Sequence, residues 1–390
     1  SETKPNSLHG LMHLTREIML NIPSNKFFCI VRPTLIYGDN DPHNSYGPNK
    51  FFRSAKKNED IKLFGKGEEL RDHVWIEEHP EFYTKNENGE IIDPINPDTG
   101  ESWGWTDVAD LNYDNKELWT EMRKDMRYWV EEQNIDGFRC DVAGEVPTEF
   151  WESAVEEMKQ VKPIFMLAES EDKDLFEKAF DMGYNWEGHH ILNAIAQGKQ
   201  NAKDLSDYMK KIDTTYQEDD YLMNFVTNHD ENSWNGTVNE RMGNAAEVMM
   251  ALSFTLPGMP LIYSGQEYDM QKRLRFFEKD TIPHKQNKFW PILSKLGTLK
   301  NESPALDGSK TEAGYSTIKN SDEDVIFSFK RQQNDDEVIF IGNLSDRKKE
   351  FNIDLEGQFI DYMNNEKVFV IEKNQKFQFS PWEYKILIIQ

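Results

Sequence analysis

The chain has 390 residues and a formal net charge of −25 at neutral pH. It is long enough to bury a large core and to hold roughly two or three domains. Its acidity excludes nucleic acid and anionic membranes as expected partners, because both would repel it. No apolar run approaches the length of about 18 residues that is typical of a transmembrane helix, so we expect no membrane association.

The charge is distributed unevenly along the chain. Residues 1–78 carry 11 Lys and Arg against 11 Asp and Glu, whereas residues 79–390 carry 34 against 59. A break this sharp favours a domain boundary near residue 78. The two cysteines, Cys29 and Cys140, are too few for a disulfide scaffold. The first residues are not typical of a signal peptide, so we expect a cytoplasmic location, although the missing initiator Met leaves room for an upstream segment.

The N-terminal region mixes helical and extended patterns. Apolar residues at helical spacing predict a helix over residues 8–21, and the apolar run at residues 27–31 predicts a buried strand. A turn-rich stretch at residues 38–48 precedes a second predicted helix at residues 51–57.

From residue 79 the pattern changes. Residues 79–110 are polar and rich in Asn, Gly and Pro, which predicts a long loop or a small additional domain. The elements expected next are helices at residues 118–130, 148–160 and 245–254, and strands at residues 135–142, 164–168, 222–227 and 260–264. Their alternation predicts βαβ units around a parallel sheet. Short β patterns follow at residues 325–329, 338–341, 368–371 and 384–389 and predict an antiparallel C-terminal domain.

Three of the predicted strands lead into an acidic residue. Asp141, Glu169 and Asp230 each follow an apolar run, where a parallel strand delivers its last residues to a polar loop. Barrel enzymes build one pocket from such strand ends. Two carboxylic acids and a further group that stabilises an oxocarbenium-like transition state are also what cleavage of a glycosidic bond requires. One such acid alone is typical of a solvated loop, whereas the three together favour a catalytic site.

The residues next to these acids suggest a role for each of them. Asp141 is best placed as the nucleophile, because Arg139 lies two residues earlier on the same side of the strand and would keep the carboxylate ionised. Glu169 is expected to be the acid/base, since a less compensated site favours its protonated form. His229 and Asp230 are expected to grip the sugar hydroxyls.

Five segments carry a family resemblance in order along the chain: Asp110-Leu111-Asn112, residues 137–143, Ala168-Glu169, Asn228-His229-Asp230 and residues 258–267. Together they resemble the α-amylase superfamily of retaining glycosidases over residues 79–390. The resemblance implies an α/β fold with a (β/α)₈ TIM-type barrel at residues 79–315, in which residues 79–110 form a domain-B-like loop. A C-terminal antiparallel β-sandwich at residues 316–390 follows.

The resemblance also implies the chemistry. The expected reaction is retaining hydrolysis of α-1,4 or α-1,6 bonds in α-glucans or maltooligosaccharides by Asp141, Glu169 and Asp230. The residues expected to bind substrate are Arg139, Asn228, His229, Glu145 and Trp105. Trp103 and Trp234 are further candidates for stacking on glucose rings. We expect no metal ligand and no cofactor, and the sequence gives no support for a structural calcium ion. The oligomeric state is not predicted.

The sequence departs from the family in two places. Typical α-amylases carry a Lys-His pair after the nucleophile, where this chain has Gly144 and Glu145. Residues 142–146 look closer to neopullulanases and cyclomaltodextrin-degrading enzymes. The family's Asp-x-x-x-Asn-His motif and recognisable first three barrel strands are missing from the sequence. We therefore expect an incomplete barrel with about five of eight βα units and impaired activity.

Residues 1–78 carry a second set of motifs, at residues 31–38, 44–49, 63–65 and 67–74. These resemble the C-terminal part of NAD-dependent sugar-nucleotide epimerases and dehydratases, the extended short-chain dehydrogenases, so we expect a short α/β epimerase-like fragment. The sequence has no Gly-x-Gly-x-x-Gly for dinucleotide binding. His9 and His13 stand where that family has its Tyr-x-x-x-Lys dyad. The fragment alone is therefore predicted to be inactive.

Three functions stay open from the sequence. The first is a glycoside hydrolase acting on α-glucans. The second is an NAD-dependent epimerase or dehydratase fragment that works only if an external half completes it. The third is a carbohydrate-binding remnant without catalysis. The abrupt junction is consistent with a gene fusion, a recombination scar or an assembly chimera, and the sequence does not choose among them.

Overall fold

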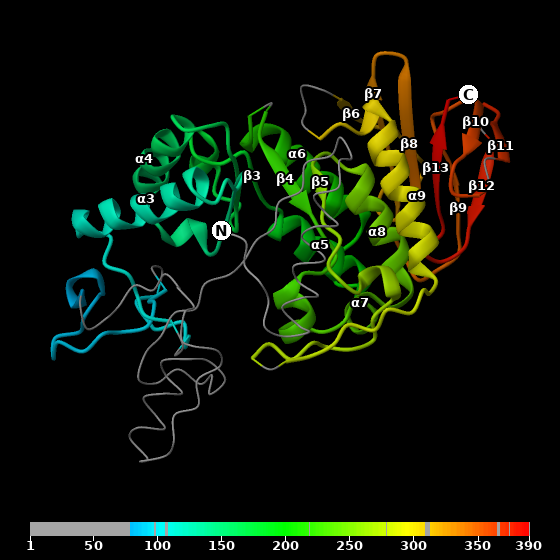
Figure 1. Cartoon of the computed structure of the whole chain (residues 1–390). Helices are drawn as coiled ribbons and strands as arrows, with labels where there is room; N and C mark the ends of the chain where they lie inside the picture. Colours follow the sequence, from blue (N-terminus) through cyan, green and yellow to red (C-terminus); the bar gives the residue numbers. More distant parts are fainter. Residues whose placement is uncertain are drawn as a thin grey trace. The chain divides into compact units, whose positions relative to one another are not determined.

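The structure is a computed structural model that describes residues 79–390 except 97–98, 106–107, 218, 278, 309–312, 365–366, 374 and 390 (Figure 1). The helices predicted at residues 8–21 and 51–57 and the strand at residues 27–31 lie outside the described residues. The described chain divides into two compact units. Residues 79–137 and 153–164 belong to the first unit, and residues 138–152 and 165–390 belong to the second.

The first unit contains η1 (Pro80–Phe82), α3 (Lys116–Glu131) and the second half of α4 (Thr148–Lys159). The side chain of Asn115 caps α3 by accepting the Glu117 N–H at 2.9 Å. A small apolar cluster of Phe82, Tyr83 and Leu118 holds the polar stretch before the helix. Three isolated β-bridges give residues 79–110 an irregular but hydrogen-bonded form, which agrees with the predicted loop or small additional domain.

The second unit begins with a five-stranded sheet in the order β1-β2-β3-β4-β5. Its strands are β1 (Gly137–Cys140), β2 (Phe165–Ala168), β3 (Met182–Tyr184), β4 (Tyr221–Asn224) and β5 (Met259–Pro260). The pairs from β2 to β5 are parallel. Four of these strands lie within predicted segments or overlap them and are shorter than predicted. β3 was not predicted, because three residues are too few to give a periodic pattern.

The helical elements of this unit are η2 (Ala143–Glu145), η3 (Lys173–Phe176), α5 (Trp186–Ala196), α6 (Ala202–Thr215), η4 (Glu231–Asn235), α7 (Val238–Met242), η5 (Gly243–Ala245), α8 (Ala246–Thr255), η6 (Gln266–Tyr268), α9 (Phe289–Glu302) and η7 (Pro304–Leu306). Capping boxes begin two of them: Asn201 with Asp204 at α6, and Thr237 with Glu240 at α7. α8 is buried over its whole length, as expected of a helix that is apolar on all sides.

Antiparallel sheets complete the unit. A six-stranded sheet has the order β11-β10-β13-β8-β7-β6, and a two-stranded sheet joins β12 to β9. The strands are β6 (Gly314–Thr317), β7 (Ile326–Gln333), β8 (Asp336–Asn343), β9 (Lys349–Asn352), β10 (Gly357–Asp361), β11 (Lys367–Ile371), β12 (Lys376–Phe379) and β13 (Tyr384–Ile388). The predicted order, a parallel sheet followed by C-terminal antiparallel strands, is confirmed.

The C-terminal sheets share their core with the helices of the same unit. Phe329 and Phe340, on β7 and β8, lie in one apolar cluster with Leu252 of α8 and Leu296 of α9, and Figure 1 shows α9 running beside these long strands. The buried Arg331 fastens this junction, because its guanidinium donates to backbone carbonyls, among them that of Asp307 at 2.7 Å.

Candidate active site

The three predicted acids follow strands of one parallel sheet. Asp141 comes directly after β1 and Glu169 directly after β2, while Asp230 follows β4 by six residues. Glu169 N–H donates to Cys140 O at 2.9 Å, which aligns the ends of the first two strands. Because neighbouring parallel strands present their carboxyl ends at one edge, the sheet delivers these acids to the same side.

One guanidinium holds two of the acids. Arg139 Nη1 donates to Asp141 Oδ1, and Arg139 Nη2 lies 2.9 Å from Glu169 Oε2. Arg139 Nε donates to the Tyr184 hydroxyl at 3.1 Å, so the third nitrogen of the guanidinium also has a partner. Because both contacts are made by nitrogens of one guanidinium, the two carboxylates lie within about 8 Å of each other. The sequence suggested Arg139 as a partner of Asp141 but gave no sign that it also pairs with Glu169.

Glu169 is placed to carry a proton near neutral pH. Its side chain is 12% exposed. Burial raises the pKa of Glu169, and the charges of Asp141 and Asp230 raise it further. Arg139 and the Val142 N–H lower it, and the resulting pKa is about 7. Both acids act on Glu169 electrostatically, so the three carboxylates lie in one local field. Asp141 differs sharply in environment, since its side chain is 74% exposed.

The strained backbone of Val142 positions one of the hydrogen bonds to Glu169. Val142 has φ 45° and ψ 43°, the left-handed region that a β-branched residue rarely adopts. This conformation turns the chain after Asp141 so that Val142 N–H donates to Glu169 Oε2 at 3.0 Å. Backbone strain of this kind persists where surrounding contacts hold it and is typical of functional sites.

The loop that carries Asp230 is held by hydrogen bonds to the buried side chain of Asn228. Asn228 is buried, and its Oδ1 accepts the backbone N–H of Asp230 at 3.1 Å and of Glu231 at 2.8 Å. Asn228 was expected to bind substrate, but in the structure its side chain supports the turn instead of facing solvent. His229 is exposed, and its Nε2 lies 3.3 Å from Asp230 Oδ2. Burial and the charge of Asp230 raise the pKa of Tyr263, which the sequence did not single out.

A buried charged network lies next to this loop. His189 Nε2 is 3.0 Å from Glu231 Oε2, and its Nδ1 is 3.1 Å from Phe225 O. Arg241 Nη1 lies 3.6 Å from the same Glu231 oxygen, and Arg241 Nη2 donates to Val226 O at 2.7 Å. None of these three side chains is predicted from the sequence. Glu231, directly after the expected Asp230, was the one signal that could have suggested the network.

The remaining predicted residues are placed less decisively. Glu145 is exposed at the end of η2, and its backbone N–H donates to Val142 O at 3.0 Å. An added Cβ at the neighbouring Gly144 would lie 2.8 Å from Ser170 Oγ, so a larger residue there would require the Ser170 hydroxyl to move. Trp105 belongs to the first unit, where its ring stacks on that of Trp103 with centroids 5.4 Å apart. Its part in the site stays a prediction.

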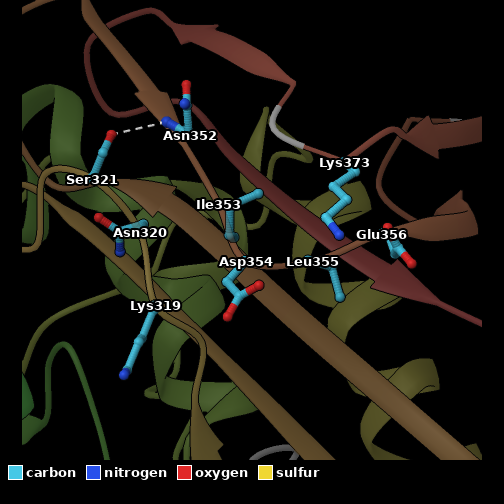
Figure 2. Close-up of a pocket in the computed structure, with 9 residues that line it drawn as sticks. All are labelled: Lys319, Asn320, Ser321, Asn352, Ile353, Asp354, Leu355, Glu356 and Lys373. Carbon is cyan, nitrogen blue, oxygen red and sulfur yellow. Dashed lines mark hydrogen bonds between the residues drawn. The ribbon is translucent and has the colours of Figure 1, made fainter.

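A separate cavity of about 640 Å³ lies among the C-terminal strands (Figure 2). Amide and charged side chains dominate its lining, among them Lys319, Asn320, Asp354, Glu356 and Lys373. Asn352 N–H donates to Ser321 Oγ at 2.9 Å at its edge. The described residues that line it include neither an aromatic ring nor any of the predicted acids, so this cavity is distinct from the acid cluster.

No group of three or more His, Cys, Asp or Glu side chains among the described residues is arranged to hold a metal ion. No helix in the described part of the chain has the length and apolarity needed to cross a membrane.

A family model described as the catalytic domain of alpha amylase matches residues 102–338. The chain belongs to this family. A second family model, for the NAD dependent epimerase/dehydratase family, matches residues 1–85. The two matches do not overlap, and the resemblance of each part of the sequence to its family is confirmed.

Several members of the α-amylase family are similar to the chain over different lengths. Alpha-amylase 3 of Dictyoglomus thermophilum is 24% identical over 360 residues, which cover 78% of this chain and 67% of that protein. A 4-alpha-glucanotransferase of Thermotoga neapolitana is 32% identical over 172 residues, which cover 42% of this chain and 37% of the relative. The match to Alpha-amylase MalA of Haloarcula japonica spans only 35% of that relative.

The fold is that of solved α-amylase structures. The crystal structure of a noncanonic maltogenic alpha-amylase, AmyB from Thermotoga neapolitana, has a TM-score of 0.69 and 26% identity, covering 80% of this chain and 73% of that chain. An alpha-amylase from Lactobacillus plantarum follows with a TM-score of 0.68 at 24% identity and supports the fold alone.

Proposed function

We propose that the chain is a retaining glycoside hydrolase that cleaves α-glucosidic bonds in α-glucans and maltooligosaccharides. The observation that carries the proposal is the pair formed by Asp141 and Glu169 on one guanidinium, in which Asp141 is exposed while Glu169 is largely buried and has its pKa raised to about 7. Relatives named alpha-amylase and maltogenic alpha-amylase support the substrate class.

The reaction follows from this pair in two steps. A carboxylate oxygen of Asp141 attacks the anomeric carbon while the bond to the leaving oxygen breaks, and Glu169 gives that oxygen its proton. Water then attacks the same carbon, Glu169 takes a proton from it, and the ester to Asp141 breaks. Two inversions leave the configuration at the anomeric carbon unchanged. Arg139 pairs with the nucleophile, and burial favours the protonated form of Glu169.

The third acid and its loop would bind the reacting sugar. Asp230 contributes to the field at Glu169, and both it and His229 have exposed polar atoms. We propose that they hold sugar hydroxyls as the ring flattens toward the transition state. Glu145 and Trp105 are further proposed contacts, while Asn228 acts through the turn that it supports.

We also propose that the barrel is incomplete. The described residues contribute five strands to the parallel sheet, whereas the family's barrel has eight. Met259 and Ile262, on or just after the edge strand β5, are exposed large apolar residues, as expected where a neighbouring strand is missing. The high exposure of Asp141 is consistent with a pocket that lacks one wall.

The match of residues 1–85 to the epimerase family favours a second candidate function for the N-terminal part. We propose that this part is a C-terminal epimerase or dehydratase fragment, ending near residue 78, ahead of domains at residues 79–315 and 316–390. Binding of NAD by the whole chain, or turnover that depends on NAD, would support this second function. Sequencing the coding DNA across codons 70–90 tests the junction. The cytoplasmic location stays a prediction.

The test of the main proposal is the stereochemistry of hydrolysis. Nuclear magnetic resonance during hydrolysis of maltoheptaose by the whole chain should show the α-anomer of the new reducing end first. Early appearance of the β-anomer would show inversion and overturn the assigned roles. Binding of maltoheptaose without any hydrolysis would instead support a carbohydrate-binding remnant.

A further inference from the structure

An exposed group of aromatic rings includes Trp234, which follows Asp230 by four positions. The side chains of Trp234, Phe276 and Phe277 are 54%, 46% and 41% exposed. The ring centroid of Trp234 lies 5.0 Å from that of Phe276 and 6.0 Å from that of Phe277, and the two phenylalanine rings are 5.0 Å apart. We call these three residues the aromatic cluster. Large apolar rings left in water as a group mark a binding surface more often than a single exposed residue does.

The aromatic cluster is tied to Asp230 by the backbone. Trp234 lies in η4, a single π-helical turn that begins directly after Asp230. Residues four apart in a helix are neighbours on its surface, with Cβ atoms about 5–6 Å apart. Trp234 therefore lies within about one sugar ring of the acid that we propose to contact the reacting glucose.

The cluster is also held rigidly by polar contacts. The buried side chain of Asn232 accepts the Leu274 N–H at 2.8 Å and donates to Lys272 O at 3.2 Å. These bonds join η4 to the loop that carries Phe276 and Phe277, which we call the second loop. Arg273 pairs with Glu240 through Nε at 3.0 Å and Nη2 at 3.2 Å.

Hydrogen bonds and an ion pair to Asp280 also hold the second loop together. Asp280 accepts the backbone N–H of Arg275 at 3.1 Å and of Thr281 at 2.7 Å, and it pairs with Lys272. Polar bonds therefore hold both loops. Because the aromatic rings stay largely in water, their packing against one another is not what fixes the loops.

We propose that the aromatic cluster binds a second glucose ring of the substrate, adjacent to the ring held at Asp230. A glucose unit of an α-glucan has a flat face of C–H groups, and the exposed face of an indole is the matching apolar surface. Arg273 donates to the backbone carbonyl of Trp234 at 3.5 Å and pairs with Glu240, so these two side chains can bond hydroxyls at the edge of that sugar. This inference rests on the proposed function and names the residues that would select oligosaccharides over single glucosides.

The test compares substrates that do and do not reach the cluster. α-Glucosyl fluoride has one ring and fills only the position at the acids, whereas maltoheptaose extends beyond it. We expect Trp234→Ala to lower kcat/KM for maltoheptaose about tenfold, the effect of losing one aromatic contact of ordinary strength, and to leave α-glucosyl fluoride within about twofold. Trp234→Phe keeps an aromatic ring, so its kcat/KM for maltoheptaose should lie between those of the wild type and Trp234→Ala.

Phe165→Ala is the matched control, because the exposure of Phe165 is similar to that of Trp234. Phe165 is the first residue of β2 and therefore lies about 13 Å from Glu169, which follows the other end of that strand. It should leave both substrates unchanged. Thermal melts followed by circular dichroism check that each variant is folded. Unchanged maltoheptaose kinetics in Trp234→Ala would overturn the inference, and so would an equal loss on both substrates, which would mean that Trp234 only positions Asp230.

The inference can be judged even if the wild-type chain hydrolyses neither substrate and the proposed function fails. Titration calorimetry with maltoheptaose then gives the dissociation constant directly. A constant about tenfold weaker in Trp234→Ala than in the wild type supports the sugar site. Equal constants, or no binding by the wild-type chain, reject it.

Discussion

Replacing Glu169 by Gln removes a carboxyl group whose pKa is raised, mainly by burial, to about 7. With that pKa about 90% of the wild-type molecules hold the acidic proton at pH 6, against about 3% for a carboxyl with the ordinary pKa of 4.5. The environment thus multiplies the active form about thirtyfold at that pH. Proton transfer by a positioned acid contributes roughly 10²–10⁴-fold to the rate, and the amide of Gln cannot provide it.

The assay is kcat/KM against pH, measured on maltoheptaose and on α-glucosyl fluoride. For the wild-type chain we expect kcat/KM on maltoheptaose to fall tenfold per unit above a pH of about 7, because Glu169 must be protonated for the first step. Glu169→Gln should lower this value by about 10²–10⁴ and remove the alkaline limb. It should spare kcat/KM for α-glucosyl fluoride, since fluoride leaves without a proton.

Glu171→Gln is the control for this prediction. Burial also raises the pKa of Glu171, but its carboxylate accepts the Glu187 N–H at 2.9 Å and has no ion pair with Arg139. This variant should keep both the rate and the alkaline limb. If Glu169→Gln hydrolyses maltoheptaose normally, or if its alkaline limb persists, another group is the acid and our reading of the site is wrong.

Four further predictions follow from the described residues. Asp141→Asn should abolish turnover of maltooligosaccharides and cyclodextrin while sugar binding survives, because the amide keeps the shape but cannot attack; retained activity would reassign the nucleophile. Burial raises the pKa of Glu231, but His189, Asn235 and Arg241 outweigh it and lower that pKa to about 2. The resulting stabilisation, on the order of 3 kcal/mol, is present above pH 4.5 and lost as the pH falls toward 2, so denaturant titrations should show a loss of stability between these values that is absent in Glu231→Gln. Arg331→Met should cost about 3–5 kcal/mol in chemical unfolding, since it leaves several buried carbonyls without a donor, and a cost below about 1 kcal/mol would contradict this. The incomplete barrel that we propose should give hydrolysis orders of magnitude below that of an intact relative, with a low melting temperature or self-association; a monomer that melts cooperatively above roughly 60 °C, or brisk hydrolysis, would refute these expectations.

The sequence by itself suggested the three acids, because each follows a short apolar run. Strands of a parallel sheet are rich in apolar residues, so the acid that comes after such a run marks its end, as at Asp141 and Glu169. The same reasoning found α3, α4 and α8 and the long strands β7 and β8. It missed β3 and did not predict α5, α6 or α9, whose sequences lie between stronger signals.

Only the tertiary structure decided how the acids differ. No sequence pattern tells that Arg139 pairs with both Asp141 and Glu169, or that Glu169 is buried while Asp141 is not, because the pKa of a carboxyl depends on neighbours that are distant in the chain. The left-handed conformation of Val142 is a second example, since a valine in sequence predicts the opposite.

The same division holds for the surroundings of Asp230. The sequence marked Asn228, His229 and Asp230 as one motif with one expected task, binding sugar. Packing separates them, because burial makes Asn228 a support for the turn while His229 stays in solvent. It also brings Phe276 and Phe277 against Trp234, more than forty positions earlier in the chain, because Asn232 bonds the two loops together. Contacts between distant segments are set by the fold as a whole, and local patterns of residues do not encode them.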